Sequence, residues 1–458
     1  MVHLLAILVY LAALSAVGFW RSRQVRTADD FLVAGRTLPA SVLVFTLLST
    51  WIGSGSLFAG AGLGYRTGFA ALWQSAGAWV GIALVYFIAP RVRRLTQYTV
   101  PDILELRYGA AARVLGTITI VLAYTTIAAY QFRGGGRLLN LVAGLDPRTG
   151  ALITAVFCIA YTAFAGMLSV AYLDIGNGLM MLFGVGAAVA FLVGDAGGIG
   201  SAVGALRPDQ VTLFGSMTPV EALALFLPTL FLLLGEANMY QKFFSAKDER
   251  AARLAVLGWI VGTIFVETLI DSVGVFGSVV QPGLSATESE SIVVRVALTS
   301  LPTVLGVLLL AGAAAIIVST ANSFLLTPAT NLIRDVYQRF INPQVADAQI
   351  VMYTRVLVIL LGVVGFVIGN FFPSILAMAL WAYTMYGAGI TPALLAALIW
   401  PRATPQAGVA SIAVGMITTI AWEVVGLSGG YPLGLATVYP ALTFSILTLV
   451  VLSLARRA

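Results

Sequence analysis

Charged residues, cysteine and histidine are all scarce in this sequence of 458 residues. Asp, Glu, Lys and Arg make up only 10% of it, whereas a soluble domain carries about 25% charged residues. The chain is 60% hydrophobic and its mean hydropathy is +0.98, so in water it would have to bury nearly every side chain. Lipid is the more suitable solvent, and the composition predicts an integral membrane protein.

The near-absence of cysteine and histidine excludes several kinds of chemistry. Cys158 is the single cysteine and lies in an apolar run, so it can form neither an intramolecular disulfide nor a cysteine cluster for a metal. His3 is the single histidine and lies at the N-terminus, which argues against histidine-based catalysis and zinc binding. We expect no attached catalytic domain and no enzyme activity.

Long apolar runs occupy most of the sequence. A bilayer core of about 30 Å needs about 20 apolar residues per helix, and about thirteen runs meet that requirement. The expected spans are residues 2–20, 41–64, 68–90, 112–144, 149–168, 170–194, 219–244, 252–281, 302–333, 349–370, 373–400, 406–426 and 434–455. The first run lacks a basic leader and a small-residue cleavage site, so we expect a retained helix and not a signal peptide.

Basic residues gather on one side of these spans. If the N-terminus is outside, the outer loops hold only four arginines, namely Arg66, Arg148, Arg207 and Arg295. The remaining basic clusters then fall in inner loops, which is the distribution of membrane proteins. We therefore expect a multi-pass protein of the cell (inner) membrane with its N-terminus outside and its C-terminus in the cytoplasm. The net charge of +6 comes from these loop clusters and predicts no nucleic-acid partner.

Polar residues interrupt two of the spans. The second span contains Gly53, Ser54 and Gly55 in succession, and the seventh contains Glu236. Glycine disfavours a helix by about 1 kcal/mol relative to alanine, and a carboxylate within a span usually faces a cavity or a partner. Irregular backbone at this depth persists where it lines a cavity or is buried in protein. One interruption in each half of the chain is typical of a transporter built from inverted repeats.

These interruptions suggest a division of the chain into four parts. Residues 1–40 would hold an extra helix and a cytoplasmic loop, and residues 41–195 the first five-helix repeat. Residues 196–400 would hold an external loop and the second, inverted five-helix repeat, and residues 401–458 two C-terminal helices. The repeats have opposite topology because the second and seventh spans begin on opposite sides of the membrane.

The ninth span carries a cluster of polar side chains. Ser319, Thr320, Asn322 and Ser323 lie in an otherwise apolar helix, and residues three or four apart share a face. Hydroxyls in membrane helices often bond their own backbone. However, Thr320 and Ser49 both lie about 20 Å from the same predicted boundary, so hydroxyls on one span can meet freed carbonyls on the other. A neutral oxygen cage suits a monovalent cation, because calcium and magnesium prefer carboxylates.

Three carboxylates within spans complete the set of unusual polar groups. Asp174 lies near the start of the sixth span, where it either supports a second cation or caps the helix. Glu267 and Asp271 form an i, i+4 pair in the eighth span, and the sequence assigns no role to that pair.

Five short motifs resemble the solute:sodium symporter family, which includes sodium/galactose, sodium/proline, sialic acid and high-affinity choline transporters. They are FLVAGR at 31–36, STWIGSG at 49–55, SVAYLD at 169–174, YQK at 240–242 and VSTANS at 318–323. The resemblance covers residues from about 30 to about 400. It implies an all-α integral membrane protein of about thirteen transmembrane helices with a five-plus-five inverted-repeat (LeuT-like) core.

The resemblance also implies two places for sodium. One ion would be held by the backbone carbonyls of Ser49, Ile52 and Ile316 and by the hydroxyls of Ser319 and Thr320. The positions that match a second sodium site are Asp174, Ser319, Asn322 and Ser323. Asn322 stands where the family has serine, and its amide carbonyl would supply the oxygen instead.

A central cavity would lie beside the two interruptions. The residues expected to face it are Trp51, Gly53, Ser54, Ser56, Trp73, Gln74, Arg133, Glu236, Asn238 and Met239. An aromatic face such as that of Trp51 can meet a quaternary ammonium, Glu236 can pair with a cation, and Arg133 can bind a carboxylate bidentately. A zwitterion would satisfy both charges, and so would a direct Arg133–Glu236 salt bridge, in which case a sugar-like solute is the better expectation.

The predicted function is sodium-coupled symport of a small organic solute by alternating access. The solute would be an amino acid, sugar, carboxylate or quaternary amine, with Na+ as the coupling ion and the lipid bilayer as the surrounding partner. A proton-coupled carrier of the same fold is the nearest alternative. A channel is less expected, because channel filters are usually built from symmetric rings.

Overall fold

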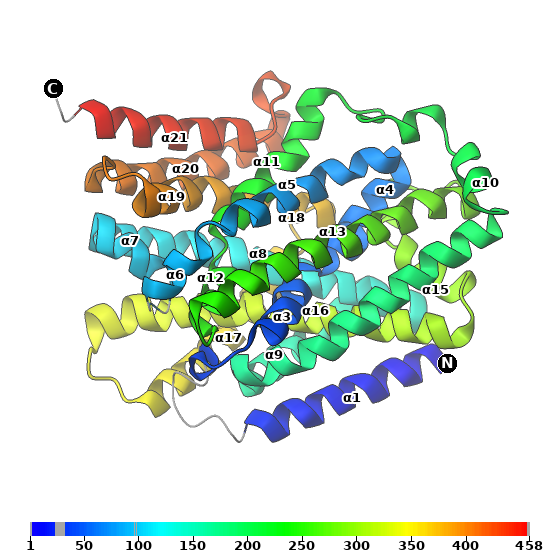
Figure 1. The fold of residues 1–458 in the computed structure, drawn as a ribbon, viewed down its shortest axis with the longest axis horizontal. Coiled ribbons are helices and arrows are strands. Elements are labelled where there is room, and N and C mark those ends of the chain that lie inside the picture. The colour runs from blue at the N-terminus through cyan, green and yellow to red at the C-terminus, as the bar shows by residue number, and fades with distance from the viewer. Residues whose placement is uncertain (1, 23–32, 96, 98, 456–458) are drawn as a thin grey trace.

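The computed structural model describes residues 2–22, 33–95, 97 and 99–455, and these residues are mostly helical (Figure 1). Phe31 and Leu32 of the first motif lie outside the described residues, as do the side chains of Ser169 and Val170 of the third. The long helices are α1 (Val2–Ser22), α5 (Leu72–Val85), α8 (Ala110–Ala143), α9 (Pro147–Asp195), α11 (Pro219–Gly235), α13 (Glu249–Val280), α16 (Thr303–Asn331), α17 (Asp347–Ile368), α18 (Ile375–Gly389), α20 (Pro405–Gly429) and α21 (Val438–Ala455).

Shorter elements connect or extend these helices. They are α3 (Ala40–Trp51), η2 (Gly55–Gly60), α4 (Ala61–Thr67), α6 (Ala89–Leu95), α7 (Val100–Tyr108), α10 (Ile199–Gly204), α12 (Ala237–Ser245), α14 (Ala286–Ser289), α15 (Ile292–Thr299), η5 (Leu332–Ile341) and α19 (Thr391–Ile399).

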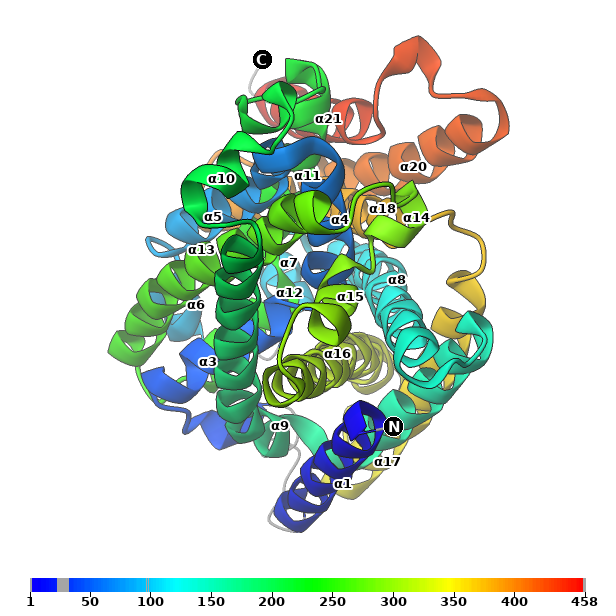
Figure 2. The same cartoon turned by 90° about the vertical axis from the view of Figure 1, so that its right-hand side faces the viewer.

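Within the described ranges, twelve helices are long and apolar enough to cross a membrane, and α3 is a shorter apolar helix before the second of them. The expected number of about thirteen is therefore approximate. It counts α3 and α4 as one broken span and α5 as the next, whereas the twelve helices include α4 and α5 together as Gly55–Val85. Helix α9 is assigned as a single helix of 49 residues, although it contains two candidate spans, Pro147–Phe164 and Ala171–Asp195. Figure 2 shows the two halves of α9 running in different directions.

Both predicted interruptions are confirmed in the backbone. Helix α3 ends at Trp51 and Ile52 is extended, with φ −75° and ψ 112°. Helix α11 ends at Gly235, Glu236 is extended with φ −61° and ψ 114°, and α12 begins at the next residue. We call the residues around Ile52 and Glu236 the break region.

Glycine is required at the first break because other elements approach it closely. A Cβ atom added at Gly53 would lie 2.9 Å from Gln131 Nε2 and 3.0 Å from Thr320 Cγ2. Such contacts are shorter than van der Waals packing tolerates, so a side chain here would displace the Gln131 amide and crowd the Thr320 methyl group. The same glycine that weakens the helix therefore allows three elements to meet.

Helix α16 is the centre of the bundle. It packs against α9, α8, α1 and α17, and Figure 2 shows it enclosed by these helices and by α15. One half of each broken span also contacts α16: α3 from the second expected span and α12 from the seventh. The polar cluster at residues 319–323 is thus placed in protein and not against lipid.

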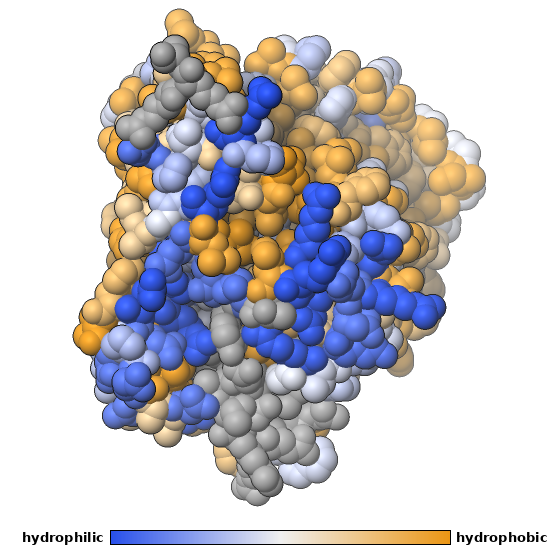
Figure 3. Space-filling view, turned by 60° about the vertical axis from the view of Figure 1, so that its left-hand side comes forward, coloured by the Kyte–Doolittle hydropathy of each residue, from blue (hydrophilic) through white to orange (hydrophobic). Residues whose placement is uncertain are grey.

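The two termini lie at opposite ends of the bundle. In Figure 1, α1 begins at the right-hand end and α21 ends at the left, which fits an odd number of crossings. Figure 3 turns the left-hand end of Figure 1 toward the viewer and shows hydrophilic side chains gathered across the lower part of that face. The exposed residues Arg91, Arg94, Lys247 and Arg250 all belong to loops or helix ends predicted to be cytoplasmic. The assignment of that end to the cytoplasm stays a prediction from the arginine distribution.

An ion cluster fastens three elements together at this end. Arg113, near the start of α8, contacts the carboxylates of Asp102 and Glu105 in α7 and donates a 2.9 Å hydrogen bond to Asp335 of η5. Arg339 of η5 reaches Glu105 from the surface at 2.9 Å. These five residues are named the Arg113 cluster below.

Candidate functional site

Thr320 joins the first break to α16. Its hydroxyl donates to the carbonyl oxygens of Ser49, at 3.0 Å, and Ile52, at 3.2 Å. These carbonyls lie at the end of α3, where the interrupted helix leaves them accessible. Ile316 is buried one turn earlier on α16. The structure therefore brings Thr320 to the Ser49 and Ile52 carbonyls, three of the five residues that the resemblance implies for one sodium site, and the ion itself stays a prediction.

Asp174 of α9 lies directly beside this contact and is fully buried. Its carboxylate accepts hydrogen bonds from Ser319, at 2.5 Å, and Thr46, at 2.7 Å. Its backbone carbonyl accepts from the Ser49 hydroxyl at 3.1 Å. Asp174 is thus a junction between α3, α9 and α16 and not a cap at the membrane interface.

The other two residues of the second predicted sodium site have different surroundings. The Ser323 hydroxyl lies 3.1 Å from the hydroxyl of Thr50 and therefore faces α3. Asn322 is buried, and its amide oxygen has no hydrogen-bond partner in the described part of the chain. That oxygen is available as a ligand, whereas Asp174 and Ser319 already contact each other.

Lys242 is a buried cation that sequence reasoning noted only as part of a motif. Its ammonium group donates to the Thr46 carbonyl at 3.0 Å and contacts the Thr50 hydroxyl. Thr46 thus links the two charges, since its hydroxyl bonds Asp174 while its carbonyl bonds Lys242. Motif spacing could not reveal this, because Lys242 and Thr46 lie in different predicted repeats and meet only after folding.

Glu236 is saturated with donors at the second break. Its carboxylate accepts from the backbone N–H groups of Asn238, at 3.1 Å, and Met239, at 2.8 Å. It also accepts from the Tyr124 hydroxyl at 2.5 Å. The first two bonds cap the N-terminus of α12, where a negative charge is favoured by the helix dipole.

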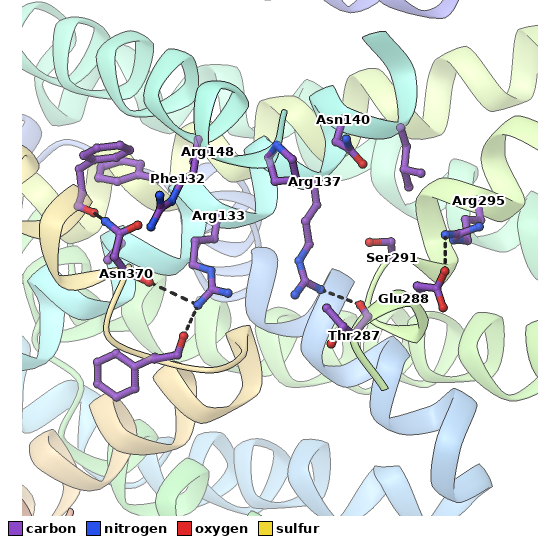
Figure 4. A pocket seen from close by; sticks show the side chains of 17 residues that line it. Phe132, Arg133, Arg137, Asn140, Arg148, Thr287, Glu288, Ser291, Arg295 and Asn370 are labelled. Carbon is purple, nitrogen blue, oxygen red and sulfur yellow. Dashed lines mark hydrogen bonds and ion pairs between the residues drawn. The ribbon is translucent and has the colours of Figure 1, made fainter. Parts of the chain in front are cut away.

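The alternative of a direct Arg133–Glu236 salt bridge is wrong for this structure. Arg133 donates to the backbone carbonyls of Gly369, at 3.3 Å, and Phe372, at 2.8 Å, and no ion pair between Arg133 and Glu236 occurs among the described residues. Arg133 lies toward the end of α8 next to the α17–α18 connection (Figure 4). Glu236 instead contacts Tyr124, more than two turns earlier on α8.

Glu267, whose role was not predictable from the sequence, orients Trp51. The indole N–H groups of Trp51 and Trp79 donate to its two carboxylate oxygens at 2.7 Å and 3.0 Å, and Ser56 also hydrogen-bonds it. The ring of Trp51 lies 5.9 Å from that of Tyr383, centroid to centroid. The other carboxylate of the pair, Asp271, accepts from Ser75 of α5 at 3.0 Å.

The two predicted cavity residues on the third span have different surroundings. Trp73 donates its indole N–H to the carbonyl of Leu213 at 2.9 Å and stacks on Phe214, so it belongs to the loop before α11. Gln74 is buried, and its amide oxygen has no partner within the described ranges.

Gln131 is a functional candidate that sequence reasoning missed. Its amide oxygen accepts from the backbone N–H of Ser54 at 2.8 Å. Its amide nitrogen and the Ser54 hydroxyl are both buried, and neither has a partner in the part of the chain that the structure describes. The available signal was an uncharged amide side chain within an expected span, two residues before Arg133. Two small cavities border the break region, each of about 10 Å³, so the centre is closed in this conformation.

Two broken helices that meet a polar stripe on a central helix define a secondary transporter of the LeuT-like type. The model of the sodium:solute symporter family matches residues 31–415, and the chain belongs to that family. The predicted sodium-coupled symport of a small organic solute in a multi-span membrane protein is therefore confirmed at the level of the family.

Individual relatives agree with this assignment. The chain is 26% identical to the high-affinity proline transporter PutP of Bacillus subtilis over 428 residues, which cover 90% of each chain. It is 26% identical to a sodium/proline symporter of Staphylococcus aureus over 438 residues, covering 91% of this chain and 85% of the relative. It is 24% identical to the osmoregulated proline transporter OpuE of Bacillus subtilis over 463 residues, covering 97% of this chain and 93% of the relative.

Solved structures give the same fold. A substrate-bound, outward-open Na+-coupled sialic acid symporter superposes with a TM-score of 0.82 at 17% identity, covering 99% of this chain and 97% of that one. MhsT in complex with L-phenylalanine superposes with a TM-score of 0.54 at 16% identity, covering 90% and 98%. These likenesses establish the LeuT-like architecture.

Proposed function

We propose that Na+ binds where Thr320 meets the Ser49 and Ile52 carbonyls and that its binding drives uptake of a small carboxylate-bearing solute, such as an amino acid. The observation that supports the ion site most directly is the pair of hydrogen bonds from one hydroxyl to two freed carbonyls, at 3.0 and 3.2 Å. An ion at this point would join α3 of the first repeat to α16 of the second. Coupling follows because an ion that bridges two moving parts favours the conformation in which they approach each other.

The unpartnered donors beside Ser54 support a carboxylate on the solute. The Gln131 amide nitrogen and the Ser54 hydroxyl are buried without partners in the described structure, and an unpaired buried donor costs about 1–3 kcal/mol. Ser54 lies where the chain resumes as a helix after the break, and the Gln131 side chain reaches it from α8. Helix N-termini favour anions. Proline and sialic acid, which appear in the names of the relatives and the solved structure, both carry a carboxylate.

We expect sodium to stabilise the purified protein against heat and potassium to do so much less. A ligand that binds only the folded state stabilises it by about 2.7 kcal/mol at 100 times its dissociation constant. Thr320→Ala should weaken the sodium effect, because one ligand is lost while alanine suits a membrane helix, and Thr330→Ala is the control because Thr330 bonds only its own helix. Equal melting shifts in sodium and potassium would rule out the selective site and favour a proton-coupled carrier.

We expect Gln131→Leu to raise the solute concentration needed for half-maximal uptake roughly tenfold, the cost of one hydrogen bond to a charged group. The sodium-dependent melting shift should persist, because Gln131 hydrogen-bonds the Ser54 backbone N–H and is not one of the oxygen ligands of the proposed sodium site. L-proline uptake into proteoliposomes measures the first quantity and differential scanning fluorimetry the second. Wild-type uptake kinetics in Gln131→Leu would place the carboxylate elsewhere.

A further inference from the structure

A large pocket lies away from the break region, at the predicted outer ends of the helices (Figure 4). Its volume is about 440 Å³, and α8, the start of α9, the α14–α15 segment and the α17–α18 connection line it. Pockets for small organic ligands hold about 300–1,000 Å³. The pocket therefore has room for a solute, which the closed break region does not offer.

Four arginines and one glutamate line this outer pocket. Arg133 and Arg137 come from α8, Arg148 from the start of α9, and Arg295 from α15, while Glu288 comes from α14. The sequence places only four arginines in the predicted outer loops, and two of them, Arg148 and Arg295, lie here. Arginine is thus rare in the predicted outer loops, and half of the arginines found there line this one pocket.

Two of these arginines already have carboxylate partners. Arg137 Nη1 lies 2.5 Å from Glu290 Oε2, and Arg295 Nη2 lies 3.7 Å from Glu288 Oε1. Their charges are therefore compensated within the protein. They shape the pocket wall but leave little net field for a ligand.

The other two arginines form no direct ion pair in the described structure, and Glu290, which acts on Arg133 from a distance, is already paired with Arg137. Arg133 bonds only neutral groups, the carbonyls of Gly369 and Phe372 and the sulfur of Met378. The guanidinium of Arg148 is exposed and makes no hydrogen bond or ion pair among the described residues. Figure 4 shows both side chains pointing into the same part of the pocket. Two like charges repel there and together attract an anion.

The remaining walls specify what kind of anion fits. Phe132, Leu141, Phe366 and Phe372 give this pocket an apolar side next to the two guanidinium groups. A guanidinium binds a carboxylate bidentately, and an apolar wall favours an organic body over an inorganic ion.

We propose that the outer pocket is a second binding site, separate from the break region, that takes a small organic carboxylate between Arg133 and Arg148. The site needs no sodium, because the Thr320 contact is not part of it. Its occupant is either the transported solute, held before it enters the centre, or a different carboxylate from the external medium. The proposal thus goes beyond the proposed function and can fail independently of it.

Binding of benzoate to the purified protein in sodium-free N-methylglucamine chloride tests this site, with benzamide as the uncharged analogue. Isothermal titration should show benzoate binding that benzamide lacks. Arg148→Gln and Arg133→Gln should each weaken benzoate binding roughly tenfold or more, as expected for a lost charge-assisted hydrogen bond. Arg207→Gln is the matched control, because Arg207 is also a predicted outer arginine but pairs with Asp209 at 3.2 Å outside the pocket.

Arg133→Gln also removes the bonds to the α17–α18 connection, so Arg148→Gln, at an exposed and unpartnered residue, is the decisive variant. Equal benzoate affinity in wild type and Arg148→Gln would overturn the proposal, and so would equal binding of benzamide. Competition by L-proline without sodium distinguishes the two sources. If L-proline displaces benzoate, the occupant of the outer pocket is the transported solute. If L-proline binds only in the presence of sodium and does not displace benzoate, the occupant is a different carboxylate.

Discussion

Arg113→Gln is expected to lower the free energy of unfolding by about 3–5 kcal/mol, the usual cost of removing one partner from a buried ion cluster. The Arg113 side chain is only 9% exposed and holds three carboxylates, of which Asp335 is fully buried. Glutamine would leave those like charges facing one another across α7 and η5. The melting temperature in detergent, compared with that of the wild type, measures the effect.

Arg339→Gln provides the matched control for this prediction. Arg339 contacts the same cluster through Glu105, but its side chain is 55% exposed, and exposed pairs contribute about 0–1 kcal/mol. A loss as large in Arg339→Gln as in Arg113→Gln would contradict the distinction between buried and exposed members. The difference between the variants therefore tests burial and not merely charge.

Loss of Arg113 should also open the predicted cytoplasmic end. The cluster fastens α7 to α8 and η5, and the small cavity beyond it includes Leu326. Because Cys158 is the single cysteine and is buried, a Leu326→Cys reporter can be alkylated selectively. We expect faster alkylation when Arg113→Gln is added, and unchanged labelling would show that the cluster stabilises the fold without controlling access.

Acidification acts on the same cluster through Glu105, which lies outside the spans. Burial alone would raise the pKa of Glu105, but hydrogen bonds from Arg339 and Arg113 outweigh burial and lower it. A carboxyl group with a lowered pKa in the folded state stabilises the protein above its unfolded pKa of about 4.3. That contribution is lost as the pH falls through the lowered folded value.

The helices and breaks were predictable because lipid imposes simple rules on sequence. Runs of about 20 apolar residues mark spans, and Gly53 and Glu236 are costly inside a helix, which is why both interruptions were found. The hydroxyl of Thr320 was matched to Ser49 by depth alone. In contrast, the sequence does not show that two expected spans join in the single helix α9. Helix propensity is a local property and does not determine how two successive helical segments are oriented.

Long side chains account for most of what the sequence did not reveal. Arg133 can reach several partners from one position on α8, and only the fold shows that the Gly369 and Phe372 carbonyls are nearer than Glu236. Lys242 likewise turns back to Thr46 from another repeat. Such contacts depend on tertiary packing, and neither spacing nor depth determines them.

Asp174→Asn is expected to have the second large effect, on both stability and sodium dependence. The carboxylate and the Lys242 ammonium are both buried and are linked through Thr46, which bonds one with its hydroxyl and the other with its carbonyl. Asparagine removes one of the two negative charges that act on Lys242, the other being Glu236. Because Asp174 and Lys242 are linked through Thr46 and not by a direct ion pair, the expected loss is about 2–3 kcal/mol, below that of a broken buried salt bridge. Scanning fluorimetry measures this loss, and sodium-dependent uptake measures the change in sodium affinity and Hill coefficient.

The double variant Asp174→Asn, Lys242→Gln separates the structural role of Asp174 from a role in ion binding. Removing both charges restores the charge balance between positions 174 and 242 and leaves Glu236 with its hydrogen-bond donors, so stability should recover in part. If the Asp174 carboxylate also binds a second sodium, the Hill coefficient of the double variant should still fall toward that of a single site. The reason is that Lys242→Gln restores the charge balance but does not replace the carboxylate as a sodium ligand. Recovery of both stability and the wild-type sodium dependence would instead show that Asp174 acts only as the partner of Lys242, and that Ser319 and Asn322 bind no second ion with it.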